Sequence, residues 1–167
     1  MKQILLLRHA KSSWDIPGLK DFDRPLATRG QNDAPRMGKF LKKSGYLPGA
    51  VISSPAQRAK ETIQLCLEAA GLDDGIITWN DDLYYGGASD YLEAIQSAPD
   101  KTERVMLVGH NPKIEDIAGE LCGEANIRVP TAALLCFEQS ANKWSQIKLE
   151  HTQLKWMVIP KMIKHLL

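Results

Sequence analysis

Short apolar segments alternate with stretches of helical periodicity along most of this chain, and that alternation limits the folds open to it. Four short, mainly apolar segments predict strands, at residues 4–7, 51–52, 76–79 and 105–108. Between most of them, apolar residues recur three and four positions apart, which is typical of amphipathic helices. Strands that alternate with helices predict a mainly parallel sheet with helices on both faces.

The pattern changes after Pro130. Residues 132–137 and 144–149 predict two further strands joined by a polar turn, hence an antiparallel hairpin, and residues 160–167 predict a last helical turn or two. We therefore expect an α/β fold, a three-layer α/β/α sandwich whose mainly parallel sheet gains a late antiparallel strand or hairpin. The length fits a single domain spanning residues 1–167 without a large cap insertion.

Two capping residues stand directly before prolines, and both pairs predict helix starts. Ser54-Pro55 and Asn111-Pro112 each offer a side-chain cap followed by a residue suited to the first helical position. A further helix is expected over residues 30–44, although Pro35 counts against its first turns.

Composition excludes several classes of partner. Lys and Arg total 21 against 20 Asp and Glu, and the net charge of +1 predicts neither nucleic-acid nor membrane binding. The apolar run at residues 4–7 ends at Arg8, which makes it too short for a secretion signal or a membrane span. Three cysteines without CxxC spacing predict reduced core residues in a cytoplasmic protein: Cys66, Cys122 and Cys136.

Basic and imidazole side chains follow three of the predicted strands. Arg8 and His9 come directly after the first, Arg58 lies shortly after the second, and His110 follows the fourth. Because ligands of such sheets gather at the carboxyl ends of the strands, these side chains are expected to converge there. Taken singly, each also fits a structural role, as a hydrogen-bonded histidine or a solvated arginine. Their convergence favours a functional site.

Phosphoryl transfer needs these residue types. The transferred group spreads negative charge over three oxygens, and catalysis consists mostly of positioning and electrostatic stabilisation. Arginine binds phosphate through a planar, permanently charged fork. A neutral imidazole attacks phosphorus when a hydrogen bond to its other nitrogen selects the tautomer, and nearby arginines keep it neutral. The aspartates lack histidine partners at ligand spacing, so no metal site is predicted.

The motifs that carry these residues resemble those of a known family. In chain order they read LRHAKSSW, DRPL followed by RG, SPAQRAKET, VGHNP and VPTA, beginning at residues 7, 23, 54, 108 and 129. This series resembles the signatures of the histidine phosphatase superfamily, and within it those of the small SixA-type phosphohistidine phosphatases. The resemblance runs over nearly the whole chain and implies a phosphatase that needs no cofactor.

The resemblance implies a role for each matching residue. His9 would be the phosphorylated nucleophile, Arg8 and Arg58 would clamp the phosphate, and His110 would contact the phosphate oxygens. The weaker candidates, for substrate binding, are Ser12 and Asn111.

The chain departs from the family at the proton donor. Many members carry a glutamate shortly after the third strand, where this chain has a tyrosine, Tyr85 by alignment. Two explanations stay open: Asp21 or Asp23 supplies the proton, or the substrate needs little acid catalysis. Phosphohistidine fits the second, because its P–N bond is labile and imidazole is far less basic than an alkoxide.

Short connections favour a macromolecular substrate. The segment at residues 86–90 leaves no room for a large cap domain, and Trp14, Tyr84 and Tyr85 are candidates for the rim of an open pocket. We expect a metal-independent phosphatase acting on phosphohistidine of a phosphorylated protein, such as a signalling phosphotransfer domain. The alternatives are a phosphatase for small phosphorylated metabolites and a non-catalytic phospho-ligand binding module, which would not need a free imidazole nucleophile.

Overall fold

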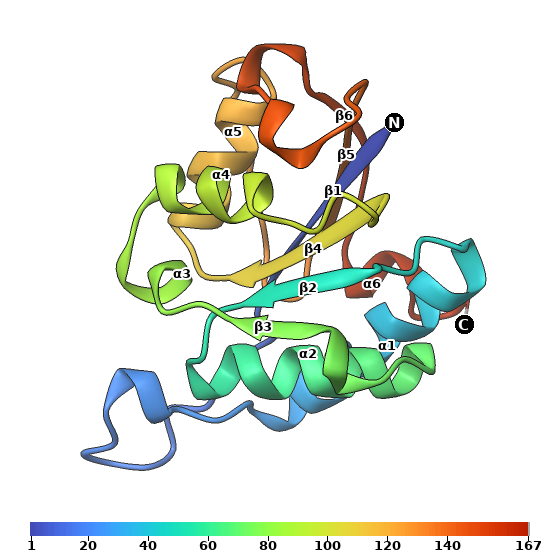
Figure 1. Ribbon diagram of the computed structural model, residues 1–167. Coiled ribbons are helices and arrows are strands. Elements are labelled where there is room, and N and C mark those ends of the chain that lie inside the picture. The colour runs from blue at the N-terminus through green and yellow to red at the C-terminus, as the bar shows by residue number, and fades with distance from the viewer. Residues whose placement is uncertain (167) are drawn as a thin grey trace.

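The computed structural model describes residues 1–166, and one six-stranded sheet lies at its centre (Figure 1). The strand order is β3-β2-β4-β1-β5-β6. The strands are β1 (Lys2–Arg8), β2 (Ala50–Ser53), β3 (Ile77–Trp79), β4 (Arg104–Gly109), β5 (Leu134–Gln139) and β6 (Gln153–Val158). The first four strands in the sheet order run parallel, whereas β5 is antiparallel to both β1 and β6.

Helices cover both faces of this sheet, α1 and α2 on one face and α4 and α5 on the other (Figure 1). The α-helices are α1 (Thr28–Ser44), α2 (Gln57–Ala70), α3 (Asp82–Tyr85), α4 (Ala88–Gln96), α5 (Lys113–Leu121) and α6 (Pro160–Ile163). Short 3₁₀ turns lie at η1 (Asp21–Asp23), η2 (Asp74–Ile76), η3 (Trp144–Gln146) and η4 (Leu149–His151). The expected three-layer α/β/α fold is confirmed. No helix within residues 1–166 is long and apolar enough to cross a membrane.

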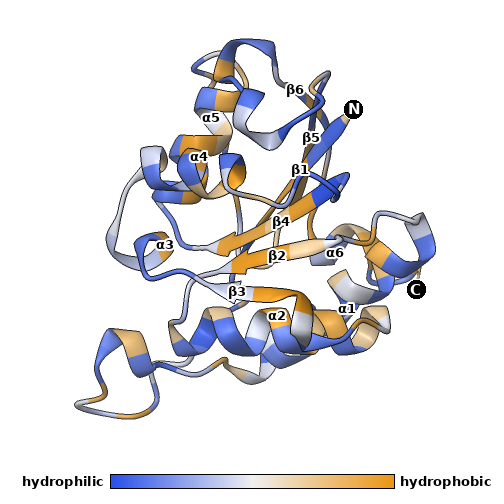
Figure 2. Ribbon diagram, in the orientation of Figure 1, coloured by the Kyte–Doolittle hydropathy of each residue, from blue (hydrophilic) through white to orange (hydrophobic). Residues whose placement is uncertain are grey.

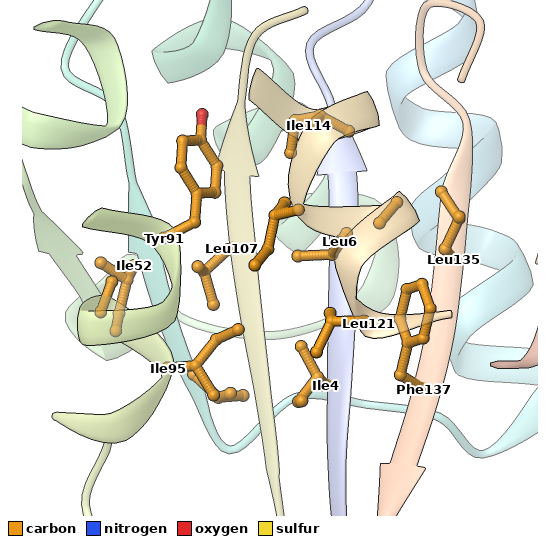
Figure 3. Close-up of a cluster of buried hydrophobic side chains, with 14 of the residues drawn as sticks. Ile4, Leu6, Ile52, Tyr91, Ile95, Leu107, Ile114, Leu121, Leu135 and Phe137 are labelled. Atoms are coloured by element: carbon orange, nitrogen blue, oxygen red, sulfur yellow. The ribbon is translucent and has the colours of Figure 1, made fainter. Parts of the chain in front are cut away.

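The central part of β1, residues 4–7, is continuously apolar because it is covered on both faces. Ile4 and Leu6 pack with α4 and α5, while Leu5 and Leu7 pack with α1 and α2, and all four are fully buried. Figure 2 shows the apolar colour concentrated on the strands and the polar colour on the outer faces of the helices. Figure 3 shows the first of these two clusters, with Tyr91 at its upper edge.

The second strand of the predicted hairpin is wrong in position. Residues 144–149 form η3 and the start of η4, and the strand that pairs with β5 is β6, further along the chain. Trp144 explains the difference: its ring is fully buried and its indole N–H donates to the Thr102 carbonyl oxygen at 2.9 Å. Because burial and this hydrogen bond hold Trp144 in the core, its segment does not pair with β5 as a strand.

The two predicted helix starts lie two residues and one residue too early. Helix α2 begins at Gln57 after Ala56, and α5 begins at Lys113 after Pro112. Neither expected cap is used at these starts: Ser54 Oγ lies against His110 Nε2, and the Asn111 amide donates to the Val129 carbonyl oxygen. Pro35 is accommodated within α1, which runs unbroken from Thr28 to Ser44.

The connections after β1 and β4 diverge at the carboxyl end of the sheet. These strands are neighbours, yet the helix after β1 (α1) packs on one face and the helix after β4 (α5) packs on the other. Ligands of open α/β sheets bind where successive connections diverge in this way. Arg8 is paired with Gly109 at this edge, so the residues that follow each strand emerge side by side.

Candidate active site

Strand register brings the loops after β1, β2 and β4 together. The backbone N–H of His9 donates to the Gly109 carbonyl oxygen at 3.0 Å, and that of Ser54 donates to the Val108 carbonyl oxygen at 3.0 Å. Gly109 is required here because a Cβ would overlap the Tyr91 hydroxyl, which accepts the N–H of His110 at 3.2 Å. The three loops are therefore fixed by backbone and core contacts.

The imidazole of His9 is held in one tautomer. Its Nδ1 lies 2.8 Å from the Ala10 carbonyl oxygen, which only accepts hydrogen bonds, so Nδ1 carries the proton. Nε2 is then unprotonated, and it accepts a long hydrogen bond from Arg58 Nε at 3.4 Å. A nucleophilic nitrogen with a locked ring is the arrangement that attack on phosphorus requires.

His110 lies beside His9 with the opposite nitrogen anchored. The two ring centroids are 5.1 Å apart, and His110 Nε2 lies 2.7 Å from Ser54 Oγ. The Ser54 hydroxyl accepts the N–H of Ala56 at 3.3 Å and can donate its own proton to Nε2. In that tautomer His110 carries its proton on Nδ1, a buried atom without a partner among the described residues. This N–H can donate to a phosphate oxygen.

The two predicted arginines take part in different contacts. Arg8 donates from Nη1 to the Val129 carbonyl oxygen at 2.9 Å, while its buried Nε has no partner among the described residues. Arg58 uses Nη1 and Nη2 on Asp21, at 2.7 Å to the backbone oxygen and 3.0 Å to the carboxylate. Arg58 Nε thus contacts His9 directly, while Arg8 Nε and His110 Nδ1 are buried donors without a partner among the described residues.

Asp21 occupies the outer side of Arg58. Its carboxylate accepts a hydrogen bond from the Tyr84 hydroxyl at 2.9 Å and lies 3.4 Å from Arg24. Partial burial raises the pKa of Asp21, but the Tyr84 hydrogen bond and the charge of Arg58 outweigh it, and the net pKa is lowered. Asp21 is therefore an ionised acceptor in this conformation and holds no proton to donate.

Burial and nearby cations keep both histidines neutral. Burial, followed by the charges of Arg58 and Arg8, lowers the pKa of His9 to about 3 against the opposing effect of its bond to Ala10. For His110, burial and then the neighbouring His9 and Arg58 lower the pKa to about 2. His9 is consequently an unprotonated base at neutral pH.

The remaining predicted residues are divided between site and surface. Ser12 is buried and its Oγ accepts from Arg24, so it is linked to Arg58 only through Arg24 and then Asp21. Asn111 donates from Nδ2 to the Val129 carbonyl oxygen at 3.1 Å. Asp23 is exposed and makes none of the ion pairs found at the site within residues 1–166. No three His, Cys, Asp or Glu side chains of that range cluster like metal ligands.

Sequence reasoning missed three residues that shape the site. Ser54 was expected to be a helix cap, yet it orients His110. Thr62 accepts the N–H of Ala10 at 2.9 Å and donates to the Arg58 carbonyl oxygen at 2.6 Å, so it ties α2 to the loop that carries His9. Arg24 is buried and its guanidinium lies 3.4 Å from the ring centroid of Trp14. One of these residues has a signal in the sequence: Thr62 lies four positions after Arg58, so the two share a helix face.

The neutral histidines should make folding sensitive to acid. In the unfolded chain both take up protons near pH 6.5, whereas in the folded state their pKa values are about 3 and about 2. The unfolded state then binds more protons, so stability falls as pH drops from about 6.5 toward 3, by up to about 1.4 kcal/mol per pH unit for each histidine.

Urea unfolding at pH 7, 6 and 5 measures this slope. The variant His9→Asn should show a slope reduced by the share of one histidine, while His151→Asn, at an exposed position, serves as the matched control. Carboxylate titration is common to all three proteins and cancels in the comparison. Equal slopes for the wild type and His9→Asn would contradict this, because they would show that His9 takes up its proton over the same pH range in the folded and unfolded states.

The family model of the histidine phosphatase superfamily (branch 1) matches residues 4–133. An uncharacterised chloroplastic protein of Arabidopsis thaliana is 32% identical over 154 residues, which cover 87% of this chain and 70% of that protein. The structure of a candidate phosphohistidine phosphatase SixA from Agrobacterium tumefaciens is 29% identical, with a TM-score of 0.79 over 95% of this chain and 98% of that one.

A structure at lower identity shares the fold. A candidate alpha-ribazole-5'-P phosphatase from Escherichia coli is 14% identical and superposes with a TM-score of 0.73 over 96% of this chain and 98% of that one. One fold therefore serves phosphatases described by different substrates, and the substrate has to be argued from the site. The chain belongs to branch 1 of the histidine phosphatase superfamily, is a phosphatase, and within that family resembles the SixA type.

Proposed function

We propose that this phosphatase hydrolyses phosphohistidine carried on another protein, without a metal ion, through a phosphohistidine intermediate on His9. The observation that carries the proposal is the unprotonated Nε2 of His9. Its ring is locked by the Ala10 carbonyl oxygen, its pKa is lowered to about 3, and it faces the Nε of Arg58. A neutral, oriented imidazole among phosphate-binding donors is a nucleophile for phosphoryl transfer.

In the first step, His9 Nε2 attacks phosphorus in line with the bond that breaks. A P–N bond forms to His9 while the P–N bond to the substrate histidine breaks, and its electron pair leaves with the substrate nitrogen. That imidazole leaves as a neutral group when its second nitrogen is protonated. Arg8, Arg58 and His110 direct N–H groups at the oxygens of the moving phosphoryl group, whose charge they stabilise.

In the second step, water attacks phosphorus on the opposite side from His9. The P–N bond to His9 breaks, its electron pair returns to Nε2, and orthophosphate is released with the proton of the water. Because the pKa of His9 lies far below neutral, the nitrogen is regenerated in the unprotonated form needed for the next turnover.

The surroundings of the leaving group support a substrate that needs little acid catalysis. Asp21, the carboxylate at this side of the site, is ionised and accepts hydrogen bonds from Arg58 and Tyr84. Tyr85 has an exposed side chain that packs edge-on against Tyr84. Imidazole is a better leaving group than an alkoxide, so a phosphoramidate suits this environment better than an alkyl phosphate.

The rim of the site supports a substrate displayed on a protein. Trp14 is 73% exposed and Tyr85 is 71% exposed, and they contact Arg24 and Tyr84 respectively at the edge of the site. The connection from β3 to α4 contains only the four-residue helix α3. Large exposed aromatic side chains beside a catalytic centre are typical of surfaces that contact other macromolecules.

The direct test compares kcat/KM for a phosphohistidine-bearing phosphotransfer protein with values for a panel of sugar and nucleotide phosphates, with and without EDTA. We expect the protein substrate to be preferred by at least an order of magnitude and EDTA to have no effect. A preference for one metabolite by orders of magnitude would favour the second candidate function, a small-metabolite phosphatase. That candidate is retained because the Escherichia coli structure, described by a small-molecule substrate, has the same fold.

The role of Asp21 gives a separate prediction. Asp21→Asn keeps an acceptor for Tyr84 but removes the charge that competes with phosphate for Arg58. Orthophosphate should therefore inhibit this variant about threefold more strongly, as expected for loss of a half-exposed ion pair, with kcat for phosphohistidine within about threefold of wild type.

The control is Asp23→Asn, in the same turn but outside these contacts. A fall in kcat of roughly 10²-fold or more in Asp21→Asn alone would instead make Asp21 the proton donor.

A further inference from the structure

A groove lined by cations runs between α1 and α6. It encloses about 640 Å³, and its walls include Pro130, Thr131 and the short helix α6. A second hollow along α1 continues it and shares three of its residues. We call this combined surface the basic groove; its cations are Arg29, Arg36, Lys39, Lys161 and Lys164.

The positive charge of the basic groove is largely uncompensated. Asp33 is its one lining carboxylate within residues 1–166, and it is buried against Arg36 at 2.6 Å and Arg29 at 3.4 Å. Lys39 and Lys161 are exposed and form no ion pair within that part of the chain. Because the whole protein carries only +1, five cations on one surface leave the remainder acidic. The molecule is electrostatically polarised.

The basic groove begins next to the catalytic residues. Thr131 lies in its wall, and the next residue, Ala132, donates its N–H to the backbone oxygens of Arg8 and His9 at 3.1 Å. Helix α1 reaches the same place from the other side, since Ala27 donates to the Lys11 carbonyl oxygen at 2.8 Å. A single large ligand could therefore lie in the groove and reach the catalytic residues at the same time.

The distance between the cations sets a minimum size for a ligand that contacts all of them. Arg29 and Lys39 are ten residues apart on one helix, which is about 15 Å of helix axis. A single phosphate or carboxylate is too small to contact both ends and α6 together. Several carboxylates on a rigid surface can do so.

We propose that the basic groove docks the carboxylate-rich face of the phosphoprotein whose phosphohistidine enters the site at His9. This inference rests on the proposed function and assigns the substrate an acidic surface beside its phosphohistidine. Exposed ion pairs each contribute little affinity, but a patch of one sign steers association and raises the on-rate of an oppositely charged partner. The groove should therefore raise the rate at which the phosphoprotein binds and leave the rate of the chemical step unchanged.

The test reverses charge at three exposed groove positions, in the triple variant Lys39→Glu, Lys161→Glu and Lys164→Glu. The matched control reverses three exposed lysines elsewhere, Lys101→Glu, Lys143→Glu and Lys148→Glu, and gives the same net charge. Each protein is assayed at low and high salt with two substrates, an acidic phosphotransfer protein phosphorylated on histidine and free phosphohistidine. The free amino acid also reports whether each variant is folded.

For the groove variant we expect kcat/KM on the phosphoprotein to fall at least tenfold at low salt. The loss should shrink as salt rises, with kcat and all activity on free phosphohistidine within twofold of wild type. The control variant should lose less than threefold on either substrate. A groove variant equal to the control on the phosphoprotein would overturn the docking proposal alone. Wild-type enzyme that hydrolyses free phosphohistidine but not the phosphoprotein would overturn the proposed protein substrate together with its docking site.

Discussion

Replacing His9 with asparagine should reduce kcat for phosphohistidine by roughly 10⁴-fold or more, as removal of a covalent nucleophile does in other enzymes. The asparagine amide can take over the hydrogen bond that Nδ1 makes to the Ala10 carbonyl oxygen. What it lacks is a nucleophilic nitrogen at the position of Nε2. The loss is therefore expected in the chemical step, and it is measured as orthophosphate release under saturating substrate.

Two controls separate this effect from a folding defect. His151→Asn makes the same change at an exposed position and should retain wild-type turnover. Urea unfolding at pH 7 should show His9→Asn to be folded, since the side chain removed is neutral at that pH. A loss of less than about tenfold would mean that His9 positions phosphate without bonding to it.

Arg58→Lys should lower kcat by about 10²- to 10³-fold, which is the usual effect of removing one donor to the charge that develops in a transition state. Lysine retains the positive charge but not the fork. In the wild type, Nε of Arg58 lies 3.4 Å from His9 Nε2 while both terminal nitrogens bind Asp21. One ammonium group cannot make these contacts together, because it carries its charge at a single point.

The exposed Arg128→Lys change is the control for this prediction and should leave kcat within twofold. Inhibition by a phosphate analogue such as tungstate should weaken in Arg58→Lys along with kcat. Unchanged turnover with weaker inhibition would confine Arg58 to ground-state binding.

Much of the fold is predictable because its strongest signals are local. The apolar run at residues 4–7 marks a strand covered on both faces, and β1 is the strand with helices on either side. The placement of Arg8, His9, Arg58 and His110 follows from the same reasoning, since parallel strands deliver their carboxyl ends to one edge. These four residues come together as expected, through the pairing of Arg8 with Gly109.

The features that the sequence hides depend on contacts between distant segments. Strand β6 was misplaced because burial of Trp144 beneath Thr102 cannot be read from the apolar pattern. Ser54 resembles a helix cap by its position before proline, and only the approach of His110 gives it another partner. Asp21 contacts Tyr84 and Arg58, 63 and 37 positions away, and these contacts outweigh burial and lower its pKa.

The basic groove is hidden for the same reason. Its cations come from α1 and α6, which lie at opposite ends of the chain, and a net charge of +1 gives no sign of them. The near-neutral composition predicts no wide polyanion-binding surface, yet it does not show how charges of one sign gather on one face of the folded protein. The site and the groove are two such concentrations.

The most direct measurement is the chemical identity of the phosphorylated enzyme. Wild-type protein is mixed with a phosphotransfer protein labelled with ³²P on histidine, quenched within one turnover, and mapped by peptide. The account predicts label on the peptide containing His9, stable to base, labile to acid and absent from His9→Asn. Label on another residue, label that survives acid, or single turnover that proceeds in wild type without any labelled enzyme would contradict it.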